Sequence, residues 1–309
     1  MVTLALIGAG RWGTNIRRTL EHLPGCQLKY VETRQWKRLL TVRDLDGVLV
    51  ATPGSTHAEI ALPFIRRRIP TFIEKPLTTS LRDALRLQTA AKKFGALVFV
   101  GHVHLYSPAY WKAKDLARRA GRIRLITAEG MNNGPYRDDM SALWDWAPHD
   151  LAMALDLVGK PPSTVQATGF SMLRPRTKLY DVATLRLEFP GSTQFLGTYN
   201  WMAPEKRKRL VIHGTRHTVI YDDVADRKVT LLNDFGPTVR GQTVQRHEPK
   251  IEHPSYRLIA PLTEELRAFV RCIRTKKRPL SDLAQGVDVV RILDAAERSI
   301  DRGGIAMSL

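Results

Sequence analysis

Cysteine is scarce in this sequence: Cys26 and Cys272 are the only two among 309 residues. Two distant cysteines exclude a disulfide framework and a site built from several thiolate metal ligands. Long apolar runs are lacking too, since none approaches the roughly 18–20 residues that a membrane-spanning helix requires. Residues 1–7 have no basic region and no cleavage site after an apolar stretch, so they predict a strand and not a signal peptide. We therefore expect a cytoplasmic protein without membrane contact.

Acidic residues are few relative to basic ones: 30 Asp and Glu stand against 48 Lys and Arg, which gives a net charge of +18. The densest basic runs, residues 66–68 and 206–209, lie among basic residues scattered along the whole chain. No DNA- or RNA-binding motif accompanies them, so nucleic acid is not an expected partner. The charge indicates attraction to small anionic ligands.

Strand-like and helix-like segments alternate over the first hundred residues, which predicts a parallel sheet with helices on both faces. The expected strands are residues 3–7, 28–31, 47–51, 71–73 and 97–100, and the expected helices are 14–23, 58–67 and 81–94.

The rhythm changes after about residue 101. Residues 182–189 alternate apolar and polar side chains, which is typical of a sheet with one buried face. The segment 233–254 is expected to be a loop. Further strands are expected at 123–128, 165–170, 194–199, 209–212, 218–221 and 229–232, and helices at 108–120, 144–158, 261–274 and 283–301. The second half therefore predicts an open, mostly antiparallel sheet with helices on one side.

A glycine motif follows the first strand and opens the first helix, which is the context that gives such a motif meaning. It consists of Gly8, Gly10 and Gly13, with Arg11 and Trp12 between them. The first glycine permits a tight turn, the second lets a pyrophosphate approach the backbone, and the third lets helix and strand pack closely. The pyrophosphate would lie on the helix N–H groups. The motif predicts a Rossmann dinucleotide-binding domain.

An acidic residue is expected at the end of the second strand to bind the ribose hydroxyls, and Glu32 occupies this place. A carboxylate there favours NAD over NADP, although Arg34 and Lys37 nearby leave NADP open. The segment 32–48 is too short for a full helix and strand, so an edge strand is trimmed and NAD affinity is expected to be lower. The predicted fold class is α/β, with a Rossmann domain over residues 1–102 and an α+β domain for substrate binding and oligomerisation over 103–309.

Four sequence blocks resemble one family. Glu74, Lys75 and Pro76 follow a strand and resemble the signature of the glucose–fructose oxidoreductase / inositol dehydrogenase / MocA family. Residues 51–57 resemble the loop after its fourth strand, residues 144–150 its helix with an aspartate and a histidine one turn apart, and residues 299–304 the end of its last helix. The resemblance covers nearly the whole chain. It implies an NAD-dependent oxidoreductase, with Thr52, Pro53, His57, Glu74 and Lys75 beside the cofactor.

Residues 12–15, 143–150 and 201–209 resemble the branch of this family that acts on sugar nucleotides. That branch oxidises the 3-hydroxyl of UDP-N-acetylglucosamine or of its uronic acid, and a partner aminotransferase then installs an amine. The resemblance implies oxidation at C3 of a UDP-N-acetylhexosamine. A dehydrogenase or reductase of a free sugar, cyclitol or small carbonyl compound is the alternative, as is a non-catalytic dinucleotide sensor.

The proton chemistry needs a group that takes the hydroxyl proton, and Lys75 is the first candidate because partial desolvation beside a cofactor cation lowers a lysine pKa. His149 is the second, since imidazole titrates near neutral pH. Asp145 lies four residues earlier on the same helix face, where it orients His149 or binds a sugar hydroxyl. Asp145 and His149 with His102 and His104 also suggest a zinc site. The resemblance argues against it, so no metal is predicted.

Substrate contacts are expected from polar side chains of the second half and of the segment before it. Arg137 suits a diphosphate because its guanidinium forms paired hydrogen bonds. An open sheet face predicts a homodimer or homotetramer. The candidate substrate-binding residues are His102, Tyr106, Asn133, Arg137, Asp145, His149 and Lys206.

Overall fold

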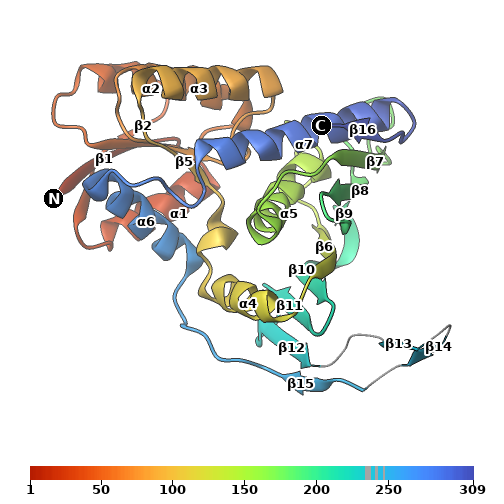
Figure 1. The fold of residues 1–309 in the computed structure, drawn as a ribbon. Coiled ribbons are helices and arrows are strands. Elements are labelled where there is room, and N and C mark those ends of the chain that lie inside the picture. The colour runs from red at the N-terminus through yellow and green to blue at the C-terminus, as the bar shows by residue number, and fades with distance from the viewer. Residues whose placement is uncertain (234–237, 241–242, 246–247) are drawn as a thin grey trace. The chain divides into compact units, whose positions relative to one another are not determined.

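The computed structural model describes residues 1–233, 238–240, 243–245 and 248–309. The chain forms two compact units (Figure 1). The first contains Met1–Ser107 and Ile259–Arg291, and the second contains Pro108–Leu258 and Ile292–Leu309. The expected division at residues 102 and 103 therefore needs correction, because a C-terminal segment returns to the first unit.

The first unit is built on a five-stranded parallel sheet with the order β2-β1-β3-β4-β5. All of β3, β4 and β5 are buried, as expected of strands covered on both faces. The strands are β1 (Val2–Ile7), β2 (Cys26–Glu32), β3 (Gly47–Val50), β4 (Thr71–Glu74) and β5 (Val98–Gly101).

Helices cover both faces of this sheet. Figure 1 shows α2 and α3 on one face and α1 and α6 on the other. The C-terminal α6 belongs here because Phe269 packs edge-on against Phe72 and Phe99, each at 5.6 Å between ring centroids. The helices are α1 (Arg11–Glu21), α2 (His57–Arg66), α3 (Leu81–Phe94) and α6 (Pro261–Thr275), and α7 (Leu283–Asp301) begins in this unit.

The trimmed edge of the sheet was predicted correctly. Between β2 and β3 the chain forms only a short 3-10 helix, η1 (Trp36–Thr41), and β2 remains the edge strand. Trp36 and Leu39 are buried, and Trp36 packs against Phe64 of α2 at 6.1 Å between ring centroids. The buried side chains of Trp36 and Leu39 therefore attach this short connection to the first unit, where a complete Rossmann domain would have a further helix and strand.

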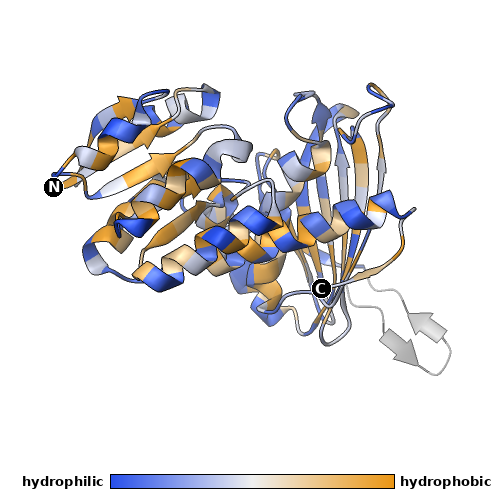
Figure 2. Ribbon diagram, turned by 90° about the horizontal axis from the view of Figure 1, so that it is seen from above, coloured by the Kyte–Doolittle hydropathy of each residue, from blue (hydrophilic) through white to orange (hydrophobic). Residues whose placement is uncertain are grey.

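The second unit contains a nine-stranded sheet with the order β15-β12-β11-β10-β6-β9-β8-β7-β16. Among the described strands of this sheet only β6 and β9 pair in parallel, so the mostly antiparallel sheet is confirmed. Figure 2 shows apolar and polar residues alternating along these strands. The strands are β6 (Ile123–Asn133), β7 (Thr164–Phe170), β8 (Val182–Phe189), β9 (Thr193–Asn200), β10 (Met202–Gly214), β11 (Thr218–Asp222), β12 (Val229–Asn233), β15 (Lys250–Glu252) and β16 (Met307–Ser308).

Helices α4 (Pro108–Arg119) and α5 (Ala142–Val158) pack on this sheet, α4 against β11 and β12 and α5 against β6, β8 and β9. The α5 helix starts where the Ser141 hydroxyl accepts the N–H of Trp144, and it ends at Gly159, whose φ is +75°. Gly130 of β6 lets α5 approach closely, since a Cβ there would lie 2.9 Å from the Trp146 Cβ.

Part of the expected loop 233–254 lies outside the described residues. In the described part of this segment, β13 (Thr238–Arg240) pairs with β14 (Thr243–Gln245), and β15 joins the large sheet. No helix within the described part of the chain is long and apolar enough to cross a membrane.

Candidate functional site

The glycine turn of the first unit has the space that a dinucleotide requires. A Cβ on Gly8 would lie 2.4 Å from the carbonyl oxygen of Ala51, and one on Gly13 would lie 2.1 Å from that of Gly8. Gly10 has no neighbouring atom within 4 Å of the position of a Cβ. The α1 helix begins at the exposed Arg11 without a side-chain cap. Open space over uncapped helix N–H groups fits the pyrophosphate of a dinucleotide.

Glu32 ends the edge strand next to this turn, and its carbonyl oxygen accepts the N–H of Gly8 at 2.8 Å. Its carboxylate pairs with Arg38 at 2.9 Å between Oε1 and Nε. Arg34 and Lys37 were the cations considered from sequence, and both are exposed. The sequence interpretation missed Arg38, which lies one turn into η1 and is the cation that Glu32 holds.

Removing the Glu32 carboxylate is expected to shift the cofactor preference. Glu32→Ala deletes the acceptor for the ribose hydroxyls and releases Arg38, whose guanidinium suits a 2′-phosphate. We expect the ratio of kcat/KM for NAD to that for NADP to fall about tenfold or more, the usual effect of losing a charged hydrogen bond. Steady-state kinetics with both cofactors measure the ratio. Arg17→Ala, at an exposed position of α1, serves as the control, and an unchanged ratio in Glu32→Ala would remove Glu32 from the cofactor site.

The loop after β3 is held from inside the protein. The His57 ring is fully buried, with Nδ1 2.9 Å from the carbonyl oxygen of Pro76 and Nε2 2.8 Å from that of Thr52. The N–H of Thr56 closes the same loop on the carbonyl oxygen of Pro53 at 2.9 Å. Burial lowers the pKa of His57. His57 was predicted to contact the cofactor, whereas both ring nitrogens face protein carbonyl groups, so it fixes the loop of Thr52 and Pro53.

A hydrogen bond joins the glycine turn to the end of β4. The indole N–H of Trp12 donates to Glu74 Oε1 at 2.5 Å, and the N–H of Lys75 donates to Glu74 Oε2 at 3.1 Å. Glu74 is buried, and burial raises its pKa to about 7 against the opposing effects of Trp12 and Lys75. Its carboxyl group is therefore occupied by the protein and connects two loops of the first unit.

Lys75 and His102 follow the ends of the neighbouring strands β4 and β5. His102 is 1% exposed, and neither ring nitrogen has a hydrogen-bond partner among the described residues. Burial and the charge of Lys75 lower the pKa of His102 to about 3. The structure thus places a half-buried lysine near an uncharged imidazole, and such an unsatisfied buried group requires a functional explanation.

Two further residues of this unit differ from the sequence interpretation. Tyr106 was predicted to bind substrate, yet its ring stacks on Phe99 at 5.3 Å and its hydroxyl bonds to Ser281 Oγ at 2.9 Å. It is 4% exposed, so its place is in the core. Glu265 of α6 was missed. It is fully buried, and burial together with the charge of Glu74 raises its pKa well above the usual range.

In the second unit, the predicted residues Arg137 and Asp145 lie together. Arg137 pairs with Asp139 through two hydrogen bonds of 2.8 and 2.7 Å, and its Nη1 lies 4.0 Å from Asp145 Oδ1. His149 is buried one turn further along α5. The Asn133 amide oxygen accepts the hydroxyl of Tyr136. Arg137 is thus already shared between two carboxylates, which a diphosphate would have to displace.

A buried polar group next to these residues was not predicted. Asp150 is 2% exposed, and burial raises its pKa to about 7, opposed by the charge of Lys208 and by Tyr199. The Lys208 Nζ also lies 5.2 Å from the ring centroid of Trp146. The signal available in the sequence was the Trp-x-x-x-Asp spacing, which puts Trp146 and Asp150 on one face of α5.

Asp150 is expected to make stability depend on pH. Its folded-state pKa, about 7, lies above the ordinary value of 3.8, so the folded protein binds this proton more tightly. That contribution to stability is complete below about pH 4 and is lost as the pH rises through 7. We expect Asp150→Asn to reduce the fall in unfolding free energy between about pH 5 and pH 8 by roughly 1 to 4 kcal/mol. Urea denaturation at both pH values tests this, and an unchanged fall would contradict it.

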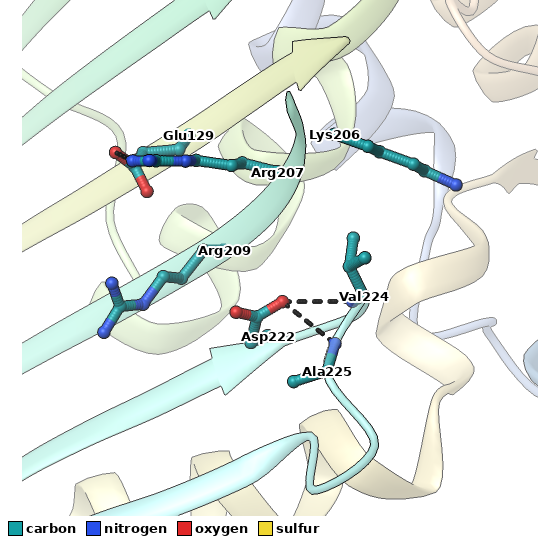
Figure 3. Close-up of a pocket in the computed structure, with 7 residues that line it drawn as sticks. All are labelled: Glu129, Lys206, Arg207, Arg209, Asp222, Val224 and Ala225. Carbon is teal, nitrogen blue, oxygen red and sulfur yellow. Dashed lines mark hydrogen bonds and ion pairs between the residues drawn. The ribbon is translucent and has the colours of Figure 1, made fainter. Parts of the chain in front are cut away.

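Lys206 lies elsewhere in the second unit. It lines a pocket of about 350 Å³ between β6, β10 and the turn after β11, and no residue of α5 lines this pocket (Figure 3). Within the described residues, no three His, Cys, Asp or Glu side chains lie together as metal ligands.

The parallel sheet and its open glycine turn, the acidic end of β2 and the lysine after β4 define an NAD-binding oxidoreductase. Residues 25–102 match the model of the oxidoreductase family with an NAD-binding Rossmann fold, and residues 110–220 match the GFO/IDH/MocA C-terminal domain. The chain belongs to the glucose–fructose oxidoreductase / inositol dehydrogenase / MocA family. Its members act on CH–OH groups.

Two curated relatives illustrate the range of similarity. Inositol 2-dehydrogenase 4 of Saccharopolyspora erythraea is 39% identical, over 52% of this chain and 46% of the relative. The scyllo-inositol 2-dehydrogenase (NAD(+)) of Bacillus subtilis is 24% identical over 90% of this chain and 88% of the relative.

Solved structures share the fold over almost the full length. A protein of Magnetospirillum magnetotacticum described as an oxidoreductase is 32% identical, with a TM-score of 0.83 over 96% of this chain and 99% of that chain. A UDP-N-acetylglucosamine 3-dehydrogenase of Acidithiobacillus ferrooxidans is 22% identical, with a TM-score of 0.82 over 97% of both chains. An inositol dehydrogenase homologue of Azotobacter vinelandii, complexed with NADH and myo-inositol, is 17% identical, with a TM-score of 0.81 over 100% and 97%.

Proposed function

We propose that this protein oxidises a secondary hydroxyl of a sugar, at C3 of a UDP-N-acetylhexosamine, with NAD as the hydride acceptor. The observation that carries the proposal is the position of Lys75 after β4, where Glu74 accepts both the N–H of Lys75 and the indole N–H of Trp12 from the glycine turn. A proton acceptor beside a hydride acceptor is the minimum that oxidation of an alcohol requires. The resemblance of residues 143–150 and 201–209 to the sugar-nucleotide branch supports the choice of substrate.

Bound NAD would lie on the turn of Gly8, Gly10 and Gly13, with its ribose hydroxyls at Glu32, and it supplies the hydride acceptor. Lys75 accepts the hydroxyl proton of the sugar. Glu74 holds the backbone of Lys75 and the Trp12 indole, so it fixes where the Lys75 side chain starts. His102 remains neutral, and a ring nitrogen would have to become exposed on substrate binding for it to hydrogen-bond to the same hydroxyl group.

The α5 helix is proposed to bind the sugar. Asp145 accepts hydrogen bonds from ring hydroxyls, and His149, one turn later, contributes a second polar contact. Arg137 beside Asp145 binds the anionic part of the substrate. Asn133 and Lys206 complete the proposed substrate contacts. A homodimer or homotetramer, and an aminotransferase that consumes the keto sugar, belong to the same proposal.

Oxidation of a cyclitol or free sugar is the second candidate, and the inositol dehydrogenase relatives favour it. The Asp145 and His149 pair would suit either substrate, since both present neighbouring ring hydroxyls. The two candidates differ in what the substrate carries: only a sugar nucleotide brings a diphosphate.

The deciding experiment follows the absorbance of reduced nicotinamide with purified protein and NAD. UDP-N-acetylglucosamine, its uronic acid, glucose and myo-inositol are supplied separately, with and without an aminotransferase and glutamate to remove a keto sugar. Turnover of a sugar nucleotide alone supports the first candidate. Turnover of inositol or glucose alone supports the second. NAD binding without turnover of any of them would favour a dinucleotide sensor and overturn the proposal of catalysis.

A further inference from the structure

We propose that the pocket beside Arg209 in the second unit binds a phosphoryl group. The pocket has a volume of about 350 Å³ and lies between β6, β10 and the turn that follows β11. Its charged lining consists of Lys206, Arg207 and Arg209 with Glu129 and Asp222. Three cations against two carboxylates leave a positive balance, and this favours an anionic ligand.

Arg209 is flanked by two carboxylates and pairs with neither. In the register of the sheet it stands opposite Glu129 of β6 and opposite Asp222 of β11. Its Nε atom is buried and has no hydrogen-bond partner among the described residues. An arginine in this position would ordinarily form an ion pair across the strands, so its unpaired Nε needs an explanation.

Both neighbouring carboxylates are directed to other partners. Glu129 Oε1 lies 3.6 Å from Arg207 Nη1. Asp222 Oδ1 accepts the N–H groups of Val224 and Ala225 at 3.0 and 3.3 Å. Figure 3 shows Arg207 lying against Glu129 and Asp222 turned to the backbone of the turn. The protein thus satisfies the two acids elsewhere and leaves the guanidinium of Arg209 available.

Lys206 adds a second available cation. It is exposed, and it forms no ion pair with any described residue. In Figure 3 the side chains of Lys206 and Arg209 extend in opposite directions from the strand that carries them. Several cations in the lining of one pocket suit a dianion better than a single carboxylate, and arginine binds phosphoryl oxygens through paired hydrogen bonds. The ligand chemistry is therefore a phosphate ester or a diphosphate.

Two sources could supply this group: the diphosphate of a sugar-nucleotide substrate, which would then lie here and not at Arg137, or a separate phosphorylated metabolite that binds as an effector. Pyrophosphate serves as the probe for both. Its binding is measured by isothermal titration calorimetry on the full chain without NAD or sugar, at constant ionic strength. The result is independent of catalysis, so a failure of the proposed function would not imitate a failure of this site.

We expect Arg209→Gln to weaken pyrophosphate binding about tenfold or more, the scale of a lost charge-assisted hydrogen bond. Arg209→Lys should weaken it less, since it keeps the charge without the fork of donors. Glu129→Gln should tighten binding a few-fold because it removes one of the two negative charges that line the pocket, while Arg207 keeps its ion pair with Glu205 at 3.1 Å. Arg186→Gln is the matched control: it removes an exposed arginine from β8 of the same sheet, where Arg186 pairs with Glu188 at 3.0 Å.

Equal affinity in the wild type, Arg209→Gln and Arg186→Gln would mean that the general charge of +18 attracts the anion, and it would overturn the proposal. No measurable binding would overturn it as well. If Arg209→Gln fails to fold, Lys206→Gln at an exposed position and Glu129→Gln carry the same test. Once pyrophosphate binding is established, the KM values of Arg209→Gln are compared with those of the wild type. A raised KM for a sugar nucleotide but not for a free sugar identifies the substrate as the source. An unchanged KM in Arg209→Gln, together with a wild-type rate that changes when pyrophosphate is added, identifies an effector.

Discussion

Replacing Lys75 with alanine is expected to lower kcat about 10³-fold. In the proposed function Lys75 accepts the proton of the sugar hydroxyl, and a positioned acid or base contributes roughly 10² to 10⁴ in rate. The Lys75 backbone is held by Glu74 whatever side chain position 75 carries, so the loop should keep its shape. The KM for NAD is therefore expected to change little. Steady-state kinetics across pH measure both quantities.

Two variants give this prediction its controls. Lys75→Arg keeps a cation but cannot release a proton near neutral pH, so it should be nearly as inactive as Lys75→Ala if the lysine acts as a base. Substantial recovery in Lys75→Arg would instead mean that only the positive charge matters. Lys37→Ala, at an exposed position of the same unit, should leave kcat unchanged. A Lys75→Ala protein with more than about a tenth of the wild-type kcat would contradict a role as proton acceptor.

A single methyl group at Gly10 is expected to abolish most NAD binding without weakening the fold. No atom lies within 4 Å of the position that a Cβ would take, and the φ of −69° is one that alanine adopts freely. The methyl group would instead occupy the space that the pyrophosphate needs against the backbone. We expect the Kd for NAD to rise about 100-fold, on the order of the several hydrogen bonds lost at a helix N-terminus. The melting temperature without NAD should stay within a few degrees.

The neighbouring Gly13 supplies the contrast. A Cβ there would lie 2.1 Å from the carbonyl oxygen of Gly8, which is backbone and cannot move aside. Gly13→Ala should therefore lower the melting temperature as well as NAD affinity. Calorimetric titration and thermal unfolding of both variants separate the two effects. Equal destabilisation by Gly10→Ala and Gly13→Ala would show that position 10 serves the fold and not the cofactor.

Local patterns predicted most elements of this fold. The helix Leu81–Phe94 and the strand Val182–Phe189 have the bounds expected from the sequence. The division into units was predicted less well, because Phe269 joins Phe72 and Phe99 across more than 160 positions of the chain. Periodicity identifies an amphipathic helix at 261–274, but it carries no information about which sheet the helix covers.

The candidate site was likewise predicted only where local sequence patterns determine it. The glycine spacing and the end of β2 were visible in the sequence, since turn geometry and strand order fix them locally. The hydrogen bond from Trp12 to Glu74 joins residues 62 positions apart, and no local pattern in either segment predicts that the two side chains are in contact. His57 and Tyr106 have polar atoms that suggested ligand contacts, whereas burial gives both of them protein partners. A side chain's type indicates what it can bind, and only the packing decides what it does bind.

The return of residues 259–291 to the first unit has a consequence for synthesis. The ribosome releases the five strands of the parallel sheet early, but the helix with Phe269 follows only after eight of the nine strands of the large sheet have been translated. Until then only α1 covers this face of the early strands, and part of the apolar face stays exposed; such intermediates are prone to aggregate or to recruit chaperones. A nascent chain halted near residue 107 should be protease-sensitive, and one halted well beyond residue 291 should be resistant. The dinucleotide-binding unit contains the first strands to be synthesised, yet it can complete its fold only when residues 259–291 have been made.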